Sequence, residues 1–282
     1  SPLLRALLIS YKIECVSQEF EMNEAPEVTP IPCLKDNYAY LLRCPSTGQT
    51  GVVDPSVAQP VLKVLRDRGW GLDYIFNTHH HWDHVGGNEE LKQEFPSVRI
   101  FGHQSDEGRI PGLTDGVQDG QVIGFGDLNG FVIHNPGHTT GAITYVWGDA
   151  AFTGDTLFAA GCGRIFEGSP QEMYSSLNQK IRSLPPETRL YFGHEYTEKN
   201  LEFSLDVEPN NHKADVLLKE VRKIRAEGKF TTPSTISQEF ATNPFMRTQE
   251  LDIQKRVREL EPDADLSPVS VFRVLREYKN RF

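Results

Sequence analysis

Residues 78–87 of this chain read THHHWDHVGG, which places four histidines and one aspartate within six consecutive positions. The run before them, Tyr74–Thr78, is predicted to be a β-strand, and Gly86-Gly87 allows the chain to turn afterwards. Imidazole nitrogens and carboxylate oxygens are the donors that borderline cations such as Zn²⁺ favour. A terminal histidine tag or a solvent loop would not place Trp and Asp between a strand and a glycine pair. The stretch therefore predicts side chains that surround a metal at a strand end.

Three later segments repeat this arrangement, with one His or Asp just past a predicted strand and beside a glycine. They are PGHT at 136–139, FTGDT at 152–156 and FGHEY at 192–196, after predicted strands at 131–134, 150–153 and 190–192. A lone histidine in a loop is more often structural than a metal ligand. Four strand ends that all present such donors favour one shared metal centre.

The predicted secondary structure changes near residue 169. The first part has one amphipathic helix at 61–68 and further short β-rich runs at 28–32, 38–42, 51–53, 99–101 and 142–147. Ser169-Pro170-Gln171-Glu172 is then a capping box, which opens a helix with Met173, Leu177 and Ile181 on one stripe. The pattern after residue 198 is helical, and the last helix is predicted to begin at Ser267-Pro268. We predict a layered α/β domain followed by a helical part.

The composition is that of an ordinary globular protein, since 38% of the 282 residues are hydrophobic and 24% are charged. No apolar run approaches the ~20 residues of a membrane span, and a formal charge of −10 argues against nucleic-acid binding. The four cysteines form no CxxC pair, which favours a reducing compartment. We expect a cytoplasmic monomer, with a mitochondrial location as the alternative, and no nucleic-acid or membrane partner. Residues 1–27 are expected to be an N-terminal arm or a targeting remnant.

The metal motifs THHHWDHVGG, PGHT, FTGDT and GHEYT resemble those of the metallo-β-lactamase superfamily. A closer resemblance is to the hydroxyacylglutathione hydrolases (glyoxalase II), through LKDNYAYLL at 34–42, LFAAGCGRIFEG at 157–168, NPFMR at 243–247 and REYKNRF at 276–282. The resemblance spans roughly residues 28–282. It implies an αβ/βα sandwich with a catalytic domain at 28–195 and a helical glutathione-binding domain at 196–282. The helix at 170–184 is predicted to belong to either part.

The resemblance also implies a centre with two divalent metal ions, of which Zn is expected first and Fe or Mn are alternatives. One ion would be held by His79, His81 and His138, the other by Asp83, His84 and His194, with Asp155 bridging them. His80 is expected to point away from the centre. Asp83 and Asp155 are the catalytic side chains, and a hydroxide shared by the two ions is the nucleophile. The implied reaction is hydrolysis of the thioester S-D-lactoylglutathione to D-lactate and glutathione, the second step of methylglyoxal detoxification.

The resemblance implies five substrate contacts. Arg276 and Lys279, three apart on one helix face, would clamp the glycine carboxylate of glutathione, and Arg164 and Tyr196 would contact its peptide backbone. Phe166 stands where some family members have Tyr, so one hydrogen bond to glutathione is missing. Without the resemblance, the basic residues of the last helix would be interpreted as a solvated helix face.

Other functions explain the sequence less well. A persulfide dioxygenase of the same superfamily would have a shorter C-terminus and one metal, which the helical tail and His194 argue against. A β-lactamase or lactonase does not account for Arg276 and Lys279. An inactive binder of glutathione conjugates is disfavoured by the complete set of ligands.

Overall fold

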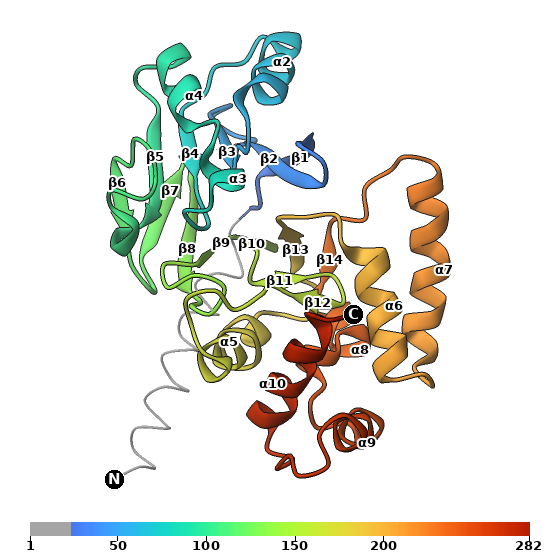
Figure 1. The fold of residues 1–282 in the computed structure, drawn as a ribbon. Coiled ribbons are helices and arrows are strands. Elements are labelled where there is room, and N and C mark those ends of the chain that lie inside the picture. Colours follow the sequence, from blue (N-terminus) through green and yellow to red (C-terminus); the bar gives the residue numbers. More distant parts are fainter. Residues whose placement is uncertain (1–23) are drawn as a thin grey trace.

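The computed structural model describes residues 24–282 as two six-stranded β-sheets packed face to face, with helices on their outer faces (Figure 1). The first sheet is antiparallel through β1, β2 and β3 and parallel from β3 to β6. Its strands in spatial order are β1 (Glu27–Cys33), β2 (Asn37–Arg43), β3 (Thr50–Val53), β4 (Tyr74–Phe76), β5 (Arg99–His103) and β6 (Asp115–Val117). The arm predicted at 1–27 lies outside the described residues up to residue 23.

In the second sheet, only β10 and β13 are parallel neighbours. Its strands in spatial order are β14 (Ser234–Thr235), β13 (Arg189–Phe192), β10 (Ala150–Gly154), β9 (Ile143–Trp147), β8 (Leu128–His134) and β7 (Val122–Phe125). A short hairpin, β11 (Leu157–Phe158) with β12 (Gly161–Cys162), forms a sheet of its own.

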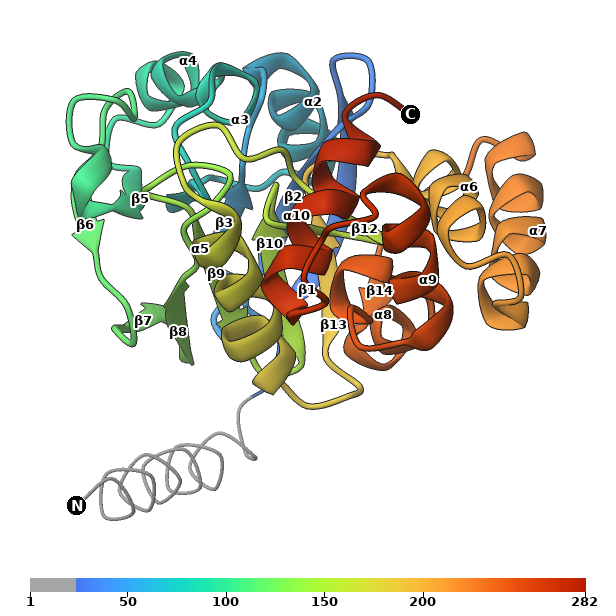
Figure 2. The same ribbon diagram turned by 60° about the horizontal axis from the view of Figure 1, so that its bottom comes forward.

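Alternation along β2 shows how the strands divide the core. Tyr38 and Tyr40 belong to the aromatic cluster between the two sheets, whereas Ala39 and Leu41 belong to the cluster on the outer face of the first sheet. Helices α2 (Ala58–Arg68) and α4 (Asn88–Glu94) cover that outer face. The outer face of the second sheet is covered by α5 (Pro170–Ser175), α9 (Leu251–Leu260) and α10 (Pro268–Lys279), as Figure 2 shows. This is the αβ/βα sandwich that the family resemblance implied, and it confirms the layered α/β domain predicted from the residue pattern.

The predicted capping box begins α5. The Ser169 hydroxyl oxygen accepts a hydrogen bond from the Glu172 backbone N–H, and the Glu172 carboxylate accepts one from the Ser169 N–H. The helix predicted to continue to residue 184 changes to a π-helical turn at Ser176–Lys180 and a 3₁₀ turn at Ile181–Ser183. Its predicted apolar stripe is nevertheless fully buried in the core against α10.

The C-terminal part contacts the sandwich through the pairing of one strand as well as through the packing of its helices. Besides α9 and α10 they are α6 (Thr197–Val207), α7 (His212–Ala226) and α8 (Ile236–Thr242). The strand β14 was not predicted; it comes from this helical part and pairs with β13 through Ser234 and Leu190. A two-residue strand is too short to show a pattern. Within residues 24–282, none of the helices combines the length and the hydropathy required to cross a bilayer.

Candidate metal centre

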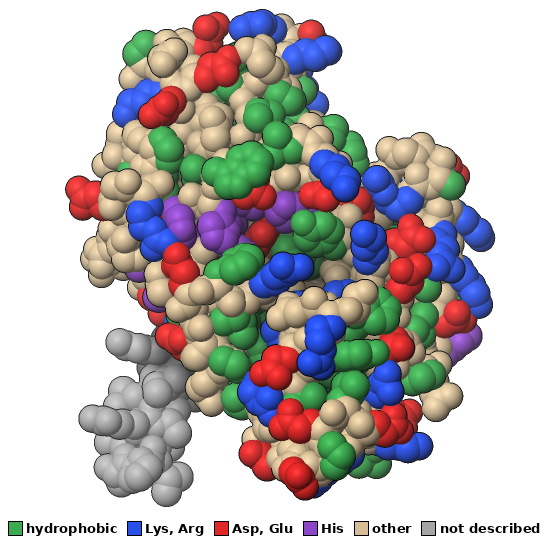
Figure 3. Space-filling model, in the orientation of Figure 1, with side chains coloured by type: hydrophobic (Ala, Val, Ile, Leu, Met, Phe, Trp, Pro, Cys, Tyr) green, Lys and Arg blue, Asp and Glu red, His purple; other side chains and the backbone are tan. Residues whose placement is uncertain are grey.

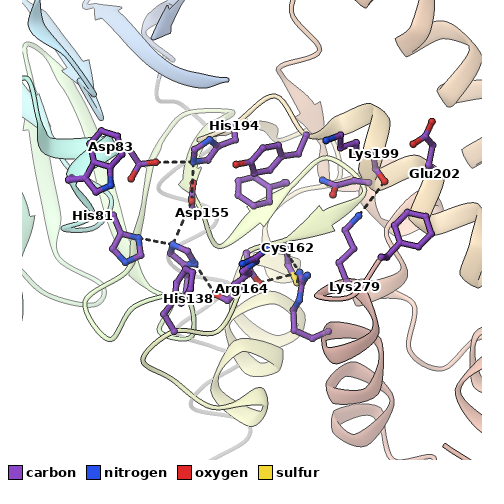
Figure 4. A pocket seen from close by; sticks show the side chains of 18 residues that line it. His81, Asp83, His138, Asp155, Cys162, Arg164, His194, Lys199, Glu202 and Lys279 are labelled. Atoms are coloured by element: carbon purple, nitrogen blue, oxygen red, sulfur yellow. Dashed lines mark hydrogen bonds and ion pairs between the residues drawn. The ribbon is translucent and has the colours of Figure 1, made fainter. Parts of the chain in front are cut away.

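Four strand ends converge at one edge of the sandwich. Because β10 and β13 run parallel and side by side, Asp155 and His194, which directly follow them, start from the same edge of the second sheet. The loop after β4 reaches this edge from the first sheet, where the Thr78 carbonyl accepts a hydrogen bond of 2.9 Å from the Ile143 N–H. His138 comes from the loop between β8 and β9. The topology thus brings together all four segments that the sequence singled out (Figure 4).

Among the described residues, three overlapping groups of three side chains could each hold a cation. Asp54, His79 and His84 form the third, which shares its histidines with the first two. In the first, His81 Nδ1 lies 3.1 Å from His79 Nε2 and 3.0 Å from His138 Nε2. The second group consists of Asp83, His84 and His194. In it, Asp83 Oδ2 lies 3.4 Å from His194 Nε2 and 3.8 Å from His84 Nε2. The first two groups have the same members as the two ligand sets that the family resemblance implies, and their donor atoms face one another.

Asp155 lies between the two groups. Its Oδ1 is 3.4 Å from His84 Nε2, and its Oδ2 is 3.2 Å from His194 Nε2 and 3.6 Å from His138 Nε2. Burial opposes ionisation of this carboxyl, but His84 and His194 offset burial and hold its pKa well below the usual value. A carboxylate in this position can contact an ion on either side.

The buried polar atoms of the site fit two cations. His84 Nε2 and Asp155 Oδ1 are buried without a hydrogen-bond partner, which is rare for polar atoms in a folded protein. Burial, followed by the charge of nearby histidines, also holds the pKa of His79 well below its usual value, so this imidazole stays neutral. Neutral imidazoles and ionised carboxylates are the protonation states that bind metals. Burial lowers the pKa of His84 and His194, but the carboxylate of Asp155 outweighs burial and raises the pKa of both, so a cation that binds there would displace a proton from each.

Three of the candidate histidine ligands are oriented by hydrogen bonds on the side of the ring that faces away from the centre. Nδ1 of His138 donates to the Arg164 carbonyl at 2.8 Å, that of His194 donates to Asp36 at 2.9 Å, and that of His84 donates to Asp54 at 3.0 Å. A proton on Nδ1 leaves the lone pair of Nε2 directed into the centre.

Asp36 and Asp54 were not predicted as supports from the sequence, and neither was Asn37, whose amide donates to Asp83 Oδ2 at 3.1 Å. Asp54 further accepts the N–H and the hydroxyl of Thr78 at 2.7 and 2.6 Å. The available signal was position, because Asp54 directly follows β3 as the candidate ligands follow other strands.

His80 turns away from the centre, as predicted. Its Nδ1 lies 3.6 Å from Asp106, and its Nε2 lies 3.5 Å from Glu167 and beside the guanidinium of Arg109. Glu167 in turn accepts hydrogen bonds from the backbone and hydroxyl of Thr140, two residues after His138. This polar cluster therefore connects the loops of His79–His84 and His138 behind the site.

A cavity of about 790 Å³ opens from the metal-ligand candidates toward α6 and α10. His81, Asp83 and His194 lie at one end of the close-up view, and Lys199 and Lys279 lie at the other (Figure 4). All five predicted substrate contacts line it, namely Arg164, Phe166, Tyr196, Arg276 and Lys279. The metal candidates and a cationic region thus share one cavity.

The two basic residues of α10 have different surroundings. Arg276 is buried, and its Nη1 donates to the Cys162 carbonyl at 2.7 Å, while its Nε is buried without a partner. Lys279 donates to the Lys199 carbonyl at 3.2 Å, and burial followed by the charge of Arg276 lowers its pKa to about 7. Arg276 therefore already supports the cavity wall, whereas Lys279 is held by a weaker contact.

Hydrogen bonds from the helical part also hold the hairpin β11–β12, which forms part of the cavity wall. The fully buried Glu239 accepts the Ala160 N–H at 2.8 Å, and Asn243 donates to the Gly161 carbonyl at 3.0 Å. Ala160 has a φ of 53°, an unfavourable conformation for a non-glycine residue. The hydrogen bonds from α8 and the residue after it hold this strained turn in place.

Comparisons with known proteins agree with this geometry. The family model "Hydroxyacylglutathione hydrolase C-terminus" matches residues 195–282, and that of the "Metallo-beta-lactamase superfamily" matches residues 35–194. A hydroxyacylglutathione hydrolase of Synechococcus sp. is 45% identical over 90% of this chain and 99% of its own length. The cytoplasmic hydroxyacylglutathione hydrolase of Arabidopsis thaliana is 42% identical over 89% of this chain and 97% of its own.

Solved structures match in fold. ETHE1 from Myxococcus xanthus superposes with a TM-score of 0.62 at 23% identity, over 91% of this chain and 98% of its own. At that identity the likeness concerns the arrangement of sheets and helices. The likeness to hydroxyacylglutathione hydrolases rests instead on the family model that matches residues 195–282 and on the curated relatives.

Proposed function

Because this chain belongs to the hydroxyacylglutathione hydrolase family of the metallo-β-lactamase superfamily, we propose a role for each of its site residues in the hydrolysis of a glutathione thioester. The enzyme cleaves the thioester of S-2-hydroxyacylglutathiones such as S-D-lactoylglutathione, which yields the 2-hydroxy acid and glutathione. This is the second step of methylglyoxal detoxification. The C-terminal match favours this activity over a persulfide dioxygenase or an inactive binder.

We propose that the two groups of side chains bind two divalent cations, with zinc as the first candidate. His79, His81 and His138 would hold one ion, Asp83, His84 and His194 the other, and Asp155 would bind both. When bound, such ions lower the pKa of water and stabilise negative charge on a carbonyl oxygen. The support is the convergence of the donor atoms, since carboxylate oxygens of Asp155 lie 3.4 Å from His84 Nε2, 3.2 Å from His194 Nε2 and 3.6 Å from His138 Nε2.

The protein's contribution is to position the substrate along the cavity. Arg276 carries positive charge at the end where the glycine carboxylate of glutathione would lie, and a carboxylate bound there would favour the charged form of Lys279. Arg164 and Tyr196 line the wall between this end and the metal-ligand candidates, so they would contact the peptide. Asp83 and Asp155 would act catalytically by fixing the ions and by orienting the attacking water.

The leaving group needs little help from an acid. A thiol has a pKa of ~8.5 in the cysteine reference, so the thiolate of glutathione is a tolerable leaving group near neutral pH. Phe166 has no hydroxyl, so it offers the departing sulfur or peptide no hydrogen bond. The cationic end of the cavity would hold the glycine carboxylate of the product glutathione until glutathione dissociates.

One observation carries the proposal: the metal-ligand candidates and the cationic end belong to the same cavity. The test is a steady-state assay with S-D-lactoylglutathione on protein of measured metal content, in which loss of the thioester absorbance and formation of D-lactate are both followed. We expect stoichiometric D-lactate and saturation with substrate. Protein that contains two ions per chain and does not hydrolyse the thioester would refute the proposal.

A further inference from the structure

The chain passes from the sandwich to the C-terminal helices between the end of β13 at Phe192 and the start of α6 at Thr197. Among the described residues that line the cavity are His194 and Tyr196, but not Glu195, which lies between them. The rings of His194 and Tyr196 are stacked, with centroids 4.8 Å apart and an angle of 2° between their planes. Figure 3 shows the row of histidines at the surface hollow. Glu195 is therefore flanked by two residues of the site, while its own side chain lies outside the cavity.

Four donors from three segments surround the Glu195 carboxylate. The Tyr38 hydroxyl, on β2, donates to Oε2. Thr231, after the end of α7, donates its N–H to Oε2 at 3.1 Å and its hydroxyl to Oε1 at 2.7 Å. Arg225 Nη1, on α7 itself, lies 3.3 Å from Oε2. A buried carboxylate is stable only with such partners, and this one connects β2 with the C-terminal helices.

The backbone on both sides of His194 is also held against the residues at the start of β2. The Asp36 carbonyl accepts the Glu195 N–H at 2.8 Å, and the Gly193 carbonyl accepts the Tyr38 N–H at 2.8 Å. The Asp36 carboxylate accepts Nδ1 of His194 at 2.9 Å. Because both the backbone and the side chain of Glu195 are held, the two stacked rings attached next to it have little freedom to move.

We propose that Glu195 is a positioning residue through which the C-terminal helices fix the candidate ligand His194 and the substrate contact Tyr196. The proposal rests on the proposed two-ion hydrolysis and adds a residue that touches neither ion nor substrate. Without the carboxylate, the Tyr38 hydroxyl and the Thr231 N–H lose their acceptor, so the backbone at 194–196 would shift until water reaches them. Such a shift would displace the His194 imidazole from its ion and Tyr196 from the substrate.

The test measures the zinc affinity of the zinc-loaded protein by competition with a chelator, together with KM and kcat for S-D-lactoylglutathione at saturating zinc. We expect Glu195→Ala to lower the affinity for the more weakly bound ion roughly tenfold or more. It should raise KM more than it lowers kcat, because Tyr196 contributes binding. Glu195→Gln keeps an acceptor for Tyr38 and Thr231 and loses only the charge that faces Arg225. Its zinc affinity and KM should lie between those of Glu195→Ala and the wild type.

Glu208→Ala is the matched control. Glu208 directly follows the C-terminus of α6, and its side chain is 9% exposed, as is that of Glu195. Its carboxylate accepts hydrogen bonds from Arg247 at 2.7 and 3.2 Å and from Asn211 at 2.7 Å. Removing it deprives the same helical part of a comparable set of contacts, but it should leave the zinc affinity and KM unchanged.

Equal zinc affinities and equal KM values in Glu195→Ala and Glu208→Ala would overturn the proposal, because Glu195 would then support the fold alone. If Glu195→Ala does not fold, Glu195→Gln and Glu208→Gln are compared, and equal values in this pair would overturn the proposal in the same way. A wild type that binds two zinc ions and does not hydrolyse the thioester would instead refute the proposed function.

Discussion

Arg276→Met and Lys279→Met separate support of the cavity wall from binding of glutathione. Arg276 is buried and donates at 2.7 Å to the Cys162 carbonyl, with a longer contact of 3.4 Å to the Gly163 carbonyl. A hydrogen bond from a charged group contributes ~1.5–3 kcal/mol. Methionine keeps the aliphatic bulk but leaves the Cys162 carbonyl unpaired, so we expect Arg276→Met to lower the free energy of unfolding by about 2–3 kcal/mol.

Lys279→Met removes a 3.2 Å contact to the Lys199 carbonyl and the contacts of the ammonium with the rings of Phe203 and Phe282, whose centroids lie 4.6 and 5.4 Å away. These contacts are weaker than those of Arg276, so the unfolding free energy should fall by only ~1 kcal/mol. Urea denaturation at constant metal concentration measures both values. Both variants should raise KM for S-D-lactoylglutathione roughly tenfold or more, and lose this effect on S-lactoyl-γ-glutamylcysteine, which lacks the glycine carboxylate. If Arg276→Met and Lys279→Met have equal free energies of unfolding, Arg276 does not support the cavity wall as described. Equal losses on both thioesters would show that neither residue clamps the carboxylate.

Three further outcomes are expected. Asp155→Ala should lose at least one ion in elemental analysis and lower turnover by orders of magnitude; retention of two tightly bound ions and near-normal turnover would exclude it as a bridge. Chelation should abolish hydrolysis and leave most of the far-ultraviolet circular dichroism, since the cores do not include the candidate ligands; complete unfolding would make the centre structural. Burial raises the pKa of Glu239 from 4.5 to about 7, so the unfolded chain binds fewer protons between these values and wild-type stability falls as pH rises. The unfolding free energy of Glu239→Gln relative to wild type should therefore rise by on the order of 3 kcal/mol between pH 4.5 and 7.5, and a pH-independent difference in urea denaturation would contradict this.

Local patterns predicted much of the fold because they reflect local physics. The capping box at Ser169 and the helix stop at Gly69, which has a φ of 66°, depend on neighbouring residues only. The strands β6, β7 and β14 were missed because pairing with other strands, not their own short sequences, stabilises them.

The same distinction applies to the site. The candidate ligands were recognisable because His and Asp directly follow strands in glycine-containing motifs. Asp54 lies 24 positions before Thr78, to which it is hydrogen-bonded, and Asp36 lies 158 positions before His194. The position of Asp54 after a strand marks it as a candidate, but the residues that Asp54 and Asp36 support become visible only when the two sheets are in place. The support that Arg276 gives to the Cys162 carbonyl, across 114 positions, is of the same kind.

Hydrolysis of S-D-lactoylglutathione by metal-stripped protein during titration with Zn²⁺ tests the two-ion centre most directly. The seven candidate ligands form two groups joined by Asp155, so the initial rate should rise until two equivalents per chain are bound and then stay constant. Equilibrium dialysis with elemental analysis gives the bound metal at each point. A rate that is already maximal at one equivalent, or hydrolysis by protein that holds no metal, would contradict the account.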